Sequence, residues 1–143
     1  MDLALAQADA ARDRGEVPVG AVIVSAEGAI LAEAGNETLM LRDPTAHAEL
    51  IAIRAACAKL GSERLIGCDL YVTLEPCAMC AAAISFARIR RLYFGALDPK
   101  GGAVEHGPRF FQQATCHHAP EVIAGLGESR AASLLKDFFA ARP

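Results

Sequence analysis

Apolar and polar positions along the chain follow two different periods, and these periods predict an order of elements. A β-branched run at 17–24, a turn at 26–28 and a second apolar run at 29–33 predict a β-hairpin. Alanine-rich or amphipathic stretches with helical spacing predict helices over residues 2–14, 45–60, 76–87 and 129–141. Short apolar runs at 69–73 and 91–95 predict strands between them. Strands that alternate with helices indicate an α/β fold with a partly parallel sheet, which the hairpin makes mixed.

The helices predicted in the middle of the chain carry signals at their ends. Thr45, which follows Asp43 and Pro44, is a candidate N-cap for the first, and Gly61 is placed to end it. Pro76 suits the first position of the second helix. Apolar side chains at helical spacing predict the buried stripe of the first of these helices as Ala46, Leu50, Ile53, Cys57 and Leu60. The same spacing predicts the apolar set of the last helix as Ala132, Leu135, Phe138 and Phe139.

Length and composition predict one folded domain over residues 1–143. Hydrophobic residues make up 53% of the chain and charged residues 22%, which excludes a wholly disordered protein. The longest nearly apolar run, residues 77–87, is shorter than the roughly 20 residues that a membrane span needs. The first residues have neither a basic region nor an apolar core typical of a signal peptide. We therefore expect a soluble, cytoplasmic protein that does not act at a membrane.

Charge is unevenly distributed along the chain. The net charge is −3, with 14 basic and 17 acidic residues, which does not by itself indicate a nucleic-acid-binding protein. Residues 84–111, however, contain five basic and two acidic side chains, so this segment is +3 and the remainder −6. The segment predicts either a local basic surface on an acidic protein or an ordinary solvated face.

The cysteines indicate metal or redox chemistry. Five cysteines in a chain without a signal peptide are poorly explained by a disulfide framework. Cys77 and Cys80 form a C-x-x-C pair at a predicted helix start, where residues three apart share one face. His47 lies near the start of the preceding predicted helix. One imidazole and two thiolates suit Zn²⁺ and leave a fourth tetrahedral position for water.

Glu49 adds a carboxylate close to this predicted metal site. It lies two residues from His47, so the two side chains converge only if the site lies off the end of the helix. A carboxylate near a metal-bound water, but not bound to the metal, is suited to proton transfer. A thioredoxin-like redox pair and a zinc-stabilised binding module are the alternatives. A second metal site at 116–118 (Cys-His-His) has no partner pair, which favours a loop or core role there.

The motif His47-Ala48-Glu49, followed after 26 residues by Pro76-Cys77-x-x-Cys80, resembles the zinc-dependent cytidine/deoxycytidylate deaminase superfamily. Within it, several longer stretches resemble the bacterial tRNA-specific adenosine deaminases. These stretches are residues 16–21, 35–36, 43–49, 71–77, 85–95, 98–102 and 137–139. The resemblance therefore extends over nearly the whole chain.

The resemblance implies a three-layer α/β/α deaminase fold with a mixed central sheet, a homodimer, and conversion of adenosine to inosine at the wobble position of the tRNA anticodon. It implies one Zn²⁺ per subunit, held by His47, Cys77 and Cys80, with Glu49 as the catalytic proton shuttle. It also implies a set of substrate-binding residues. That set is Asn36, Leu74, Glu75, Pro76, Asp98, Lys100, Phe139 and Arg142.

Two segments depart from the resemblance and keep a second substrate class open. Residues 103–107 read AVEHG where many relatives have a small Gly-Ser turn, and the C-terminus carries only Arg142 where several basic residues are expected. Both changes reduce positive charge where RNA would lie. The alternative function is deamination of a free nucleobase or nucleoside such as guanine or cytosine.

Overall fold

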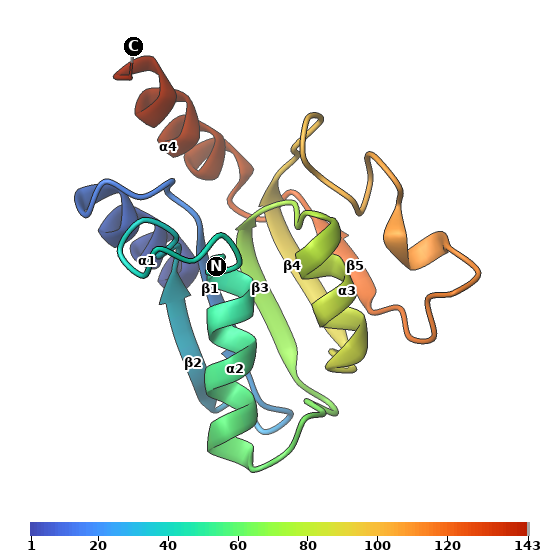
Figure 1. Cartoon of the computed structure of the whole chain (residues 1–143). Helices are drawn as coiled ribbons and strands as arrows, with labels where there is room; N and C mark the ends of the chain where they lie inside the picture. Colours follow the sequence, from blue (N-terminus) through green and yellow to red (C-terminus); the bar gives the residue numbers. More distant parts are fainter. Residues whose placement is uncertain (143) are drawn as a thin grey trace.

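The structure is a computed structural model that describes residues 1–142, and it contains a five-stranded sheet with helices on both faces (Figure 1). Its first half contains α1 (Asp2–Asp13), β1 (Gly20–Val24), β2 (Ile30–Gly35) and α2 (Ala48–Leu60). Its second half contains β3 (Asp69–Leu74), α3 (Ala78–Phe86), β4 (Arg91–Ala96), a short 3₁₀ turn (Phe110–Gln112), β5 (Glu121–Ala124) and α4 (Glu128–Ala140). None of the helices within residues 1–142 combines the length and the apolar character that crossing a membrane requires.

The sheet is mixed, as the hairpin predicted. Its strand order is β2-β1-β3-β4-β5. Strand β1 is antiparallel to both β2 and β3, whereas β3, β4 and β5 run parallel to one another. Because β2 and β3 both oppose β1, strands β2, β3 and β4 all end at the same edge of the sheet. We call this the carboxyl edge.

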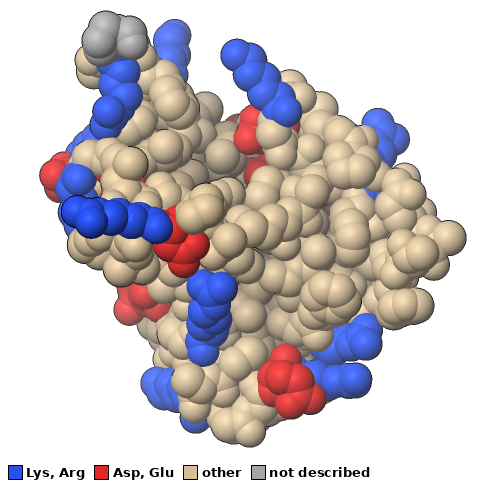
Figure 2. All heavy atoms as spheres, viewed as in Figure 1, with Lys and Arg blue, Asp and Glu red and all other residues tan. Residues whose placement is uncertain are grey.

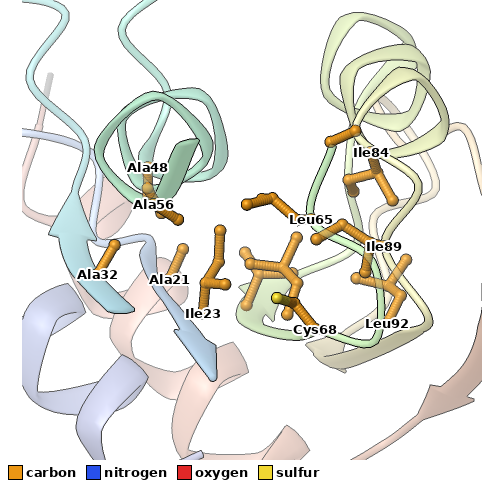
Figure 3. Close-up of a cluster of buried hydrophobic side chains, with 14 of the residues drawn as sticks. Ala21, Ile23, Ala32, Ala48, Ala56, Leu65, Cys68, Ile84, Ile89 and Leu92 are labelled. Carbon is orange, nitrogen blue, oxygen red and sulfur yellow. The ribbon is translucent and has the colours of Figure 1, made fainter. Parts of the chain in front are cut away.

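The layers confirm the α/β/α fold class. Helices α2 and α3 contact each other on one face of the sheet, and α1 and α4 contact each other on the other face (Figure 1). The main core lies between the sheet and the α2–α3 layer, where Ile23, Leu65, Ile84 and Leu92 meet (Figure 3). On the other face, a Cβ on Gly20 would lie 1.9 Å from the Ala4 carbonyl oxygen, so only glycine allows α1 to pack this closely on β1.

The predicted buried stripe of α2 is wrong in register. The buried residues of this helix are Ala48, Glu49, Ala52 and Ala56. The larger apolar side chains predicted for the stripe lie at the margin of this face, and Leu60 is 47% exposed. Small side chains let the helix axis approach the sheet closely, and Ala48 and Ala56 of this face lie against the core (Figure 3).

Other boundaries differ from the predicted ones for local reasons. Helix α2 begins at Ala48 rather than at Thr45, whose hydroxyl donates to Asp43 Oδ1 at 2.7 Å and stabilises the preceding turn. Pro76 lies two residues before α3. In α4 the buried residues are Ala131, Leu134 and Phe138, so Ala132 and Phe139 face outward. Strand β5 was not predicted, because a four-residue edge strand with little burial leaves no alternating pattern.

Candidate zinc centre and substrate pocket

The three predicted metal ligands come together at the carboxyl edge. His47 and Cys77 are the N-cap residues of α2 and α3, both with extended backbone, and Cys80 lies in the first turn of α3. His47 Nδ1 lies 3.7 Å from Cys77 Sγ and 3.6 Å from Cys80 Sγ. Zn–N and Zn–S bonds of about 2.0 and 2.3 Å in tetrahedral geometry separate nitrogen and sulfur by about 3.6 Å. The donor atoms therefore fit a zinc ion.

The pKa values of the two cysteines are shifted in a way that favours cation binding. A hydrogen bond from Cys80 lowers the pKa of Cys77 to about 4, and the same shared proton raises the pKa of Cys80. The hydrogen bond with Cys77 also raises the pKa of His47. A divalent cation takes the place of such a shared proton and allows both sulfurs to bind as thiolates.

The site has three protein ligands. Within residues 1–142 the only cluster of potential metal ligands is His47, Cys77 and Cys80, so the fourth tetrahedral position is left for a small molecule, as in catalytic zinc sites. The Cys116–His118 segment has a structural role instead. Ser85 Oγ donates to the His118 carbonyl oxygen at 2.6 Å, and His118 Nε2 donates to the Ile89 carbonyl oxygen at 2.7 Å, which fastens this segment to the end of α3.

Glu49 lies beside the metal ligands, as predicted, because the site is off the end of α2. It is in the first turn of that helix and is only 4% exposed. Burial, and to a smaller extent the Cys77 sulfur, raise the pKa of Glu49 to about 6, against the opposing effect of its own backbone N–H. A carboxyl group with a pKa this close to neutrality can both accept and release a proton.

These groups line a cavity of about 320 Å³ at the carboxyl edge. Its lining includes the metal ligands His47 and Cys77, together with Glu49 and with Asn36, which follows β2. Asn36 Oδ1 accepts a hydrogen bond from the Ala48 N–H at 2.8 Å, which fixes the start of α2. Because the oxygen is used in this way, the amide NH₂ of Asn36 is the group that is available to a ligand.

Glu75 has a role that its sequence position did not reveal. Its backbone borders the cavity, but its carboxylate is fully buried and accepts backbone N–H groups of the following loop. The donors are Asp98, Val104, Glu105 and His106, at 2.9–3.1 Å, together with the His106 ring at 2.8 Å. Burial raises the pKa of Glu75, but these hydrogen bonds outweigh that effect and hold the pKa below its usual value. The Glu75 side chain therefore anchors the loop that carries Asp98 and Lys100.

A second cavity, of about 640 Å³, adjoins the first, with which it shares Val17, Leu74, Asp98 and Gly101. Its outer wall contains Lys100 and Phe139, and Phe139 is 56% exposed. We call this second cavity the outer groove. Figure 2 shows a hollow near the top of this face, with acidic side chains beside it and a basic side chain at its rim.

Two predicted substrate-binding residues lie outside both cavities. Arg142 Nη2 donates to the Gly15 carbonyl oxygen at 2.9 Å, and its guanidinium lies 4.0 Å from the centre of the Phe138 ring. The Pro76 carbonyl oxygen accepts the Ala103 N–H at 2.9 Å. Val17 and Val19 also line the inner cavity, but the sequence analysis did not place them among the substrate-binding residues, because their β-branched run predicted a strand.

Comparison with known proteins agrees with this geometry. The family model for the cytidine and deoxycytidylate deaminase zinc-binding region matches residues 1–96, which include all three metal ligands and Glu49. The chain belongs to this deaminase family. The family's zinc-binding region and the observed donor geometry identify the cofactor of this site as zinc.

Similar proteins narrow the family further. A tRNA-specific adenosine deaminase of Agrobacterium fabrum is 65% identical over 139 residues, which cover 97% of this chain and 91% of the relative. The protein of the same name from Rickettsia bellii is 48% identical and covers 95% and 94%. A solved structure from work on A-to-I editing by tRNA:A34 deaminases at the wobble position of transfer RNA is 65% identical, with a TM-score of 0.93 over 94% of this chain and 97% of that one.

Proposed function

We propose that this deaminase converts adenosine to inosine at the wobble position of a tRNA anticodon. The observation that carries the proposal is the continuity of the zinc cavity with the outer groove. A base that enters the inner cavity can stay attached to a strand lying in the groove, against Lys100 and Phe139. A free nucleobase would need only the inner cavity. Two relatives that cover almost all of this chain are tRNA-specific adenosine deaminases.

The reaction replaces the amino group at C6 of adenine by oxygen and releases ammonia. When held by His47, Cys77 and Cys80, zinc would supply a water whose pKa is lowered toward neutrality and whose oxygen would add to C6. Glu49 is placed to take a proton from that water, to deliver it to N1 of the ring, and to relay a proton to the departing amine. Its burial keeps the carboxyl group out of bulk solvent, so the proton is passed within the site.

The remaining side chains position the base. The free amide NH₂ of Asn36 is available to an acceptor atom of the purine. The backbone of Leu74 and Glu75 borders the same cavity and can hold the exocyclic amine. Because an anticodon base lies in a loop, its withdrawal from the stack costs only a few kcal/mol. The outer groove then receives the nucleotides beside it.

The same proposal includes location and assembly. The five cysteines form no disulfide among residues 1–142, which fits a reducing compartment such as the cytoplasm, where tRNA is found. We further propose a homodimer that uses the surface of α3. Phe86, near the end of that helix, is 72% exposed, and an apolar ring at such a position is typical of a contact surface. Phe86→Asp, followed by measurement of the mass in solution, tests this part.

The decisive experiment offers the zinc-loaded protein an anticodon stem-loop with adenosine at the wobble position. Adenine, adenosine, guanine and cytosine are tested in parallel as free substrates. Inosine in the stem-loop alone supports the proposal. Ammonia released from a free base, with the stem-loop unchanged, would contradict the proposal and would show that the enzyme deaminates free nucleobases.

A further inference from the structure

A cavity of about 440 Å³ lies at the opposite edge of the sheet from the zinc centre. It is lined by Arg64, Ile66, Gly67, Arg88, Arg90 and His118. Its residues precede β3, β4 and β5, whereas the zinc ligand Cys77 follows β3. A six-residue strand such as β3 spans about 20 Å, so this basic cavity is separate from both the zinc cavity and the outer groove.

Arg88 in this cavity has no anionic partner. Its Nε atom is buried and has no hydrogen-bond partner among residues 1–142. None of the ion pairs in this part of the chain includes Arg88. Arg88 as a whole is only partly buried, but its Nε–H is shielded from solvent and has no acceptor among residues 1–142, and an anion in the cavity would supply that acceptor.

The backbone at Arg88 is also unusual for an arginine. Its φ angle is +61°, in the left-handed region that favours glycine. The Arg88 N–H donates to the Ser85 carbonyl and the Ile89 N–H to the Ile84 carbonyl, a pattern that ends α3 and normally has glycine at this position. The turn would form more easily with glycine, so the presence of arginine points to a use for its side chain.

The neighbouring charges leave the cavity positive. Arg90 makes two hydrogen bonds of 3.0 Å to the Asp69 carboxylate, which largely neutralises it. Arg64 has only a distant pairing, at 4.0 Å, with the exposed Glu63. Arg64 and Arg88 are thus the two cations at this cavity that remain available. Both arginines line this one cavity, and planar guanidinium groups suit the oxygen geometry of a phosphate.

We propose that this cavity binds a phosphate group through Arg64 and Arg88. Two sources share this chemistry: a phosphodiester of the tRNA backbone outside the anticodon loop, and a free phosphate anion. Only the first source depends on the proposed deamination of tRNA. Binding of phosphate itself can be measured without any reaction, so the two proposals can fail separately.

The test compares the thermal midpoint of the zinc-loaded protein in phosphate and in chloride at equal ionic strength. We expect phosphate at about ten times its dissociation constant to raise the midpoint by roughly 3–6 °C. Arg64→Gln and Arg88→Gly should lose this rise, whereas Arg54→Gln, an exposed arginine on α2 that lines none of these cavities, should keep it. In chloride, Arg88→Gly should be at least as stable as the parent, because glycine suits the left-handed turn.

Equal phosphate stabilisation of Arg64→Gln and the parent, or no stabilisation of the parent, would overturn the proposal. Arg64 is exposed, so its variant carries the test even if Arg88→Gly folds poorly. Steady-state deamination kinetics on whole tRNA and on the stem-loop then distinguish the two sources of the phosphate group. A KM raised several-fold for Arg64→Gln on whole tRNA alone, with kcat unchanged and a salt slope smaller by about 1, identifies the RNA backbone. An unchanged KM on both substrates, with phosphate stabilisation lost, identifies a free anion.

Discussion

Two buried glutamates at the carboxyl edge of the sheet differ in almost everything except their residue type. Glu49 lies in the first turn of α2 and is 4% exposed, while Glu75 follows β3 and is 2% exposed. Burial raises the pKa of Glu49 to about 6. Burial acts in the same direction on Glu75, but hydrogen bonds from Asp98, His106 and their neighbours reverse its effect and lower the pKa.

The hydrogen-bond donors around a buried carboxylate, rather than its burial, therefore decide its pKa and its role. Glu75 accepts hydrogen bonds from four backbone N–H groups and one imidazole. These bonds stabilise its negative charge and hold the loop in place. Glu49 has no comparable set of donors and faces the cavity with the metal ligands. In the function proposed above, the Glu49 carboxylate is the one that acts on the substrate, and the Glu75 carboxylate fixes the loop that borders the cavity.

The largest expected effect is on Glu49. Glu49→Gln should lower the deamination rate by about 10²–10⁴, because the amide cannot carry the proton. Its zinc content should be unchanged and its stability should not fall, because burial disfavours the charged form that the variant removes. Rate and bound zinc are measured together, with Glu33→Gln, an exposed glutamate on β2 that lines neither cavity, as the control. Retained deamination would contradict the role of Glu49.

Glu75→Gln should act mainly on stability. The amide NH₂ of the variant would face backbone N–H groups that need an acceptor, so some of them would lose their hydrogen bonds. We therefore expect a loss of about 1–3 kcal/mol in the free energy of unfolding. Amide exchange in residues 98–106 should become faster, and KM should rise more than kcat falls, because Asp98 and Lys100 lose their fixed positions. If Glu49→Gln and Glu75→Gln gave the same pattern of rate and stability, the distinction between the two carboxylates would be lost.

The smallest effect is expected at His106. His106→Ala removes one of five donors to Glu75 and leaves the backbone donors in place, so the loss should be about 0.5–1.5 kcal/mol. His106→Asn, which can still donate, should recover part of it. Chemical denaturation of the two His106 variants beside Glu75→Gln provides the measurement. A loss as large as that of Glu75→Gln would show that the imidazole, rather than the backbone, holds the loop.

Much of the fold could be predicted from the sequence, and the errors have identifiable causes. Periodicity gave the strand and helix order through β4, and the hairpin gave the mixed sheet. Periodicity misplaced the buried face of α2. Alanine is less hydrophobic than leucine or isoleucine, and yet the alanine face of this helix packs closest to the sheet. Periodicity also missed β5, whose four residues pair only with β4 at the edge.

The metal centre was predictable because its chemistry lies in short motifs. His47, Cys77 and Cys80 are types with high affinity for zinc, and helix starts placed them on one edge. The wall of the cavity was less predictable. The carboxylate of Glu75 anchors a loop about 30 residues further on, and Arg142 turns toward Gly15 and away from the outer groove.

The sequence by itself determined which chemistry is available: three zinc donors, one acid beside them and the order of elements that carries them. The tertiary structure decided how each group is used. It brought Asn36, Glu49 and Asp98 to one cavity from the ends or starts of different elements, and it gave Glu75 donors that Glu49 lacks. The reason is physical: residue type and spacing fix local geometry and intrinsic affinity, whereas burial and hydrogen-bond partners depend on contacts between segments far apart in the chain.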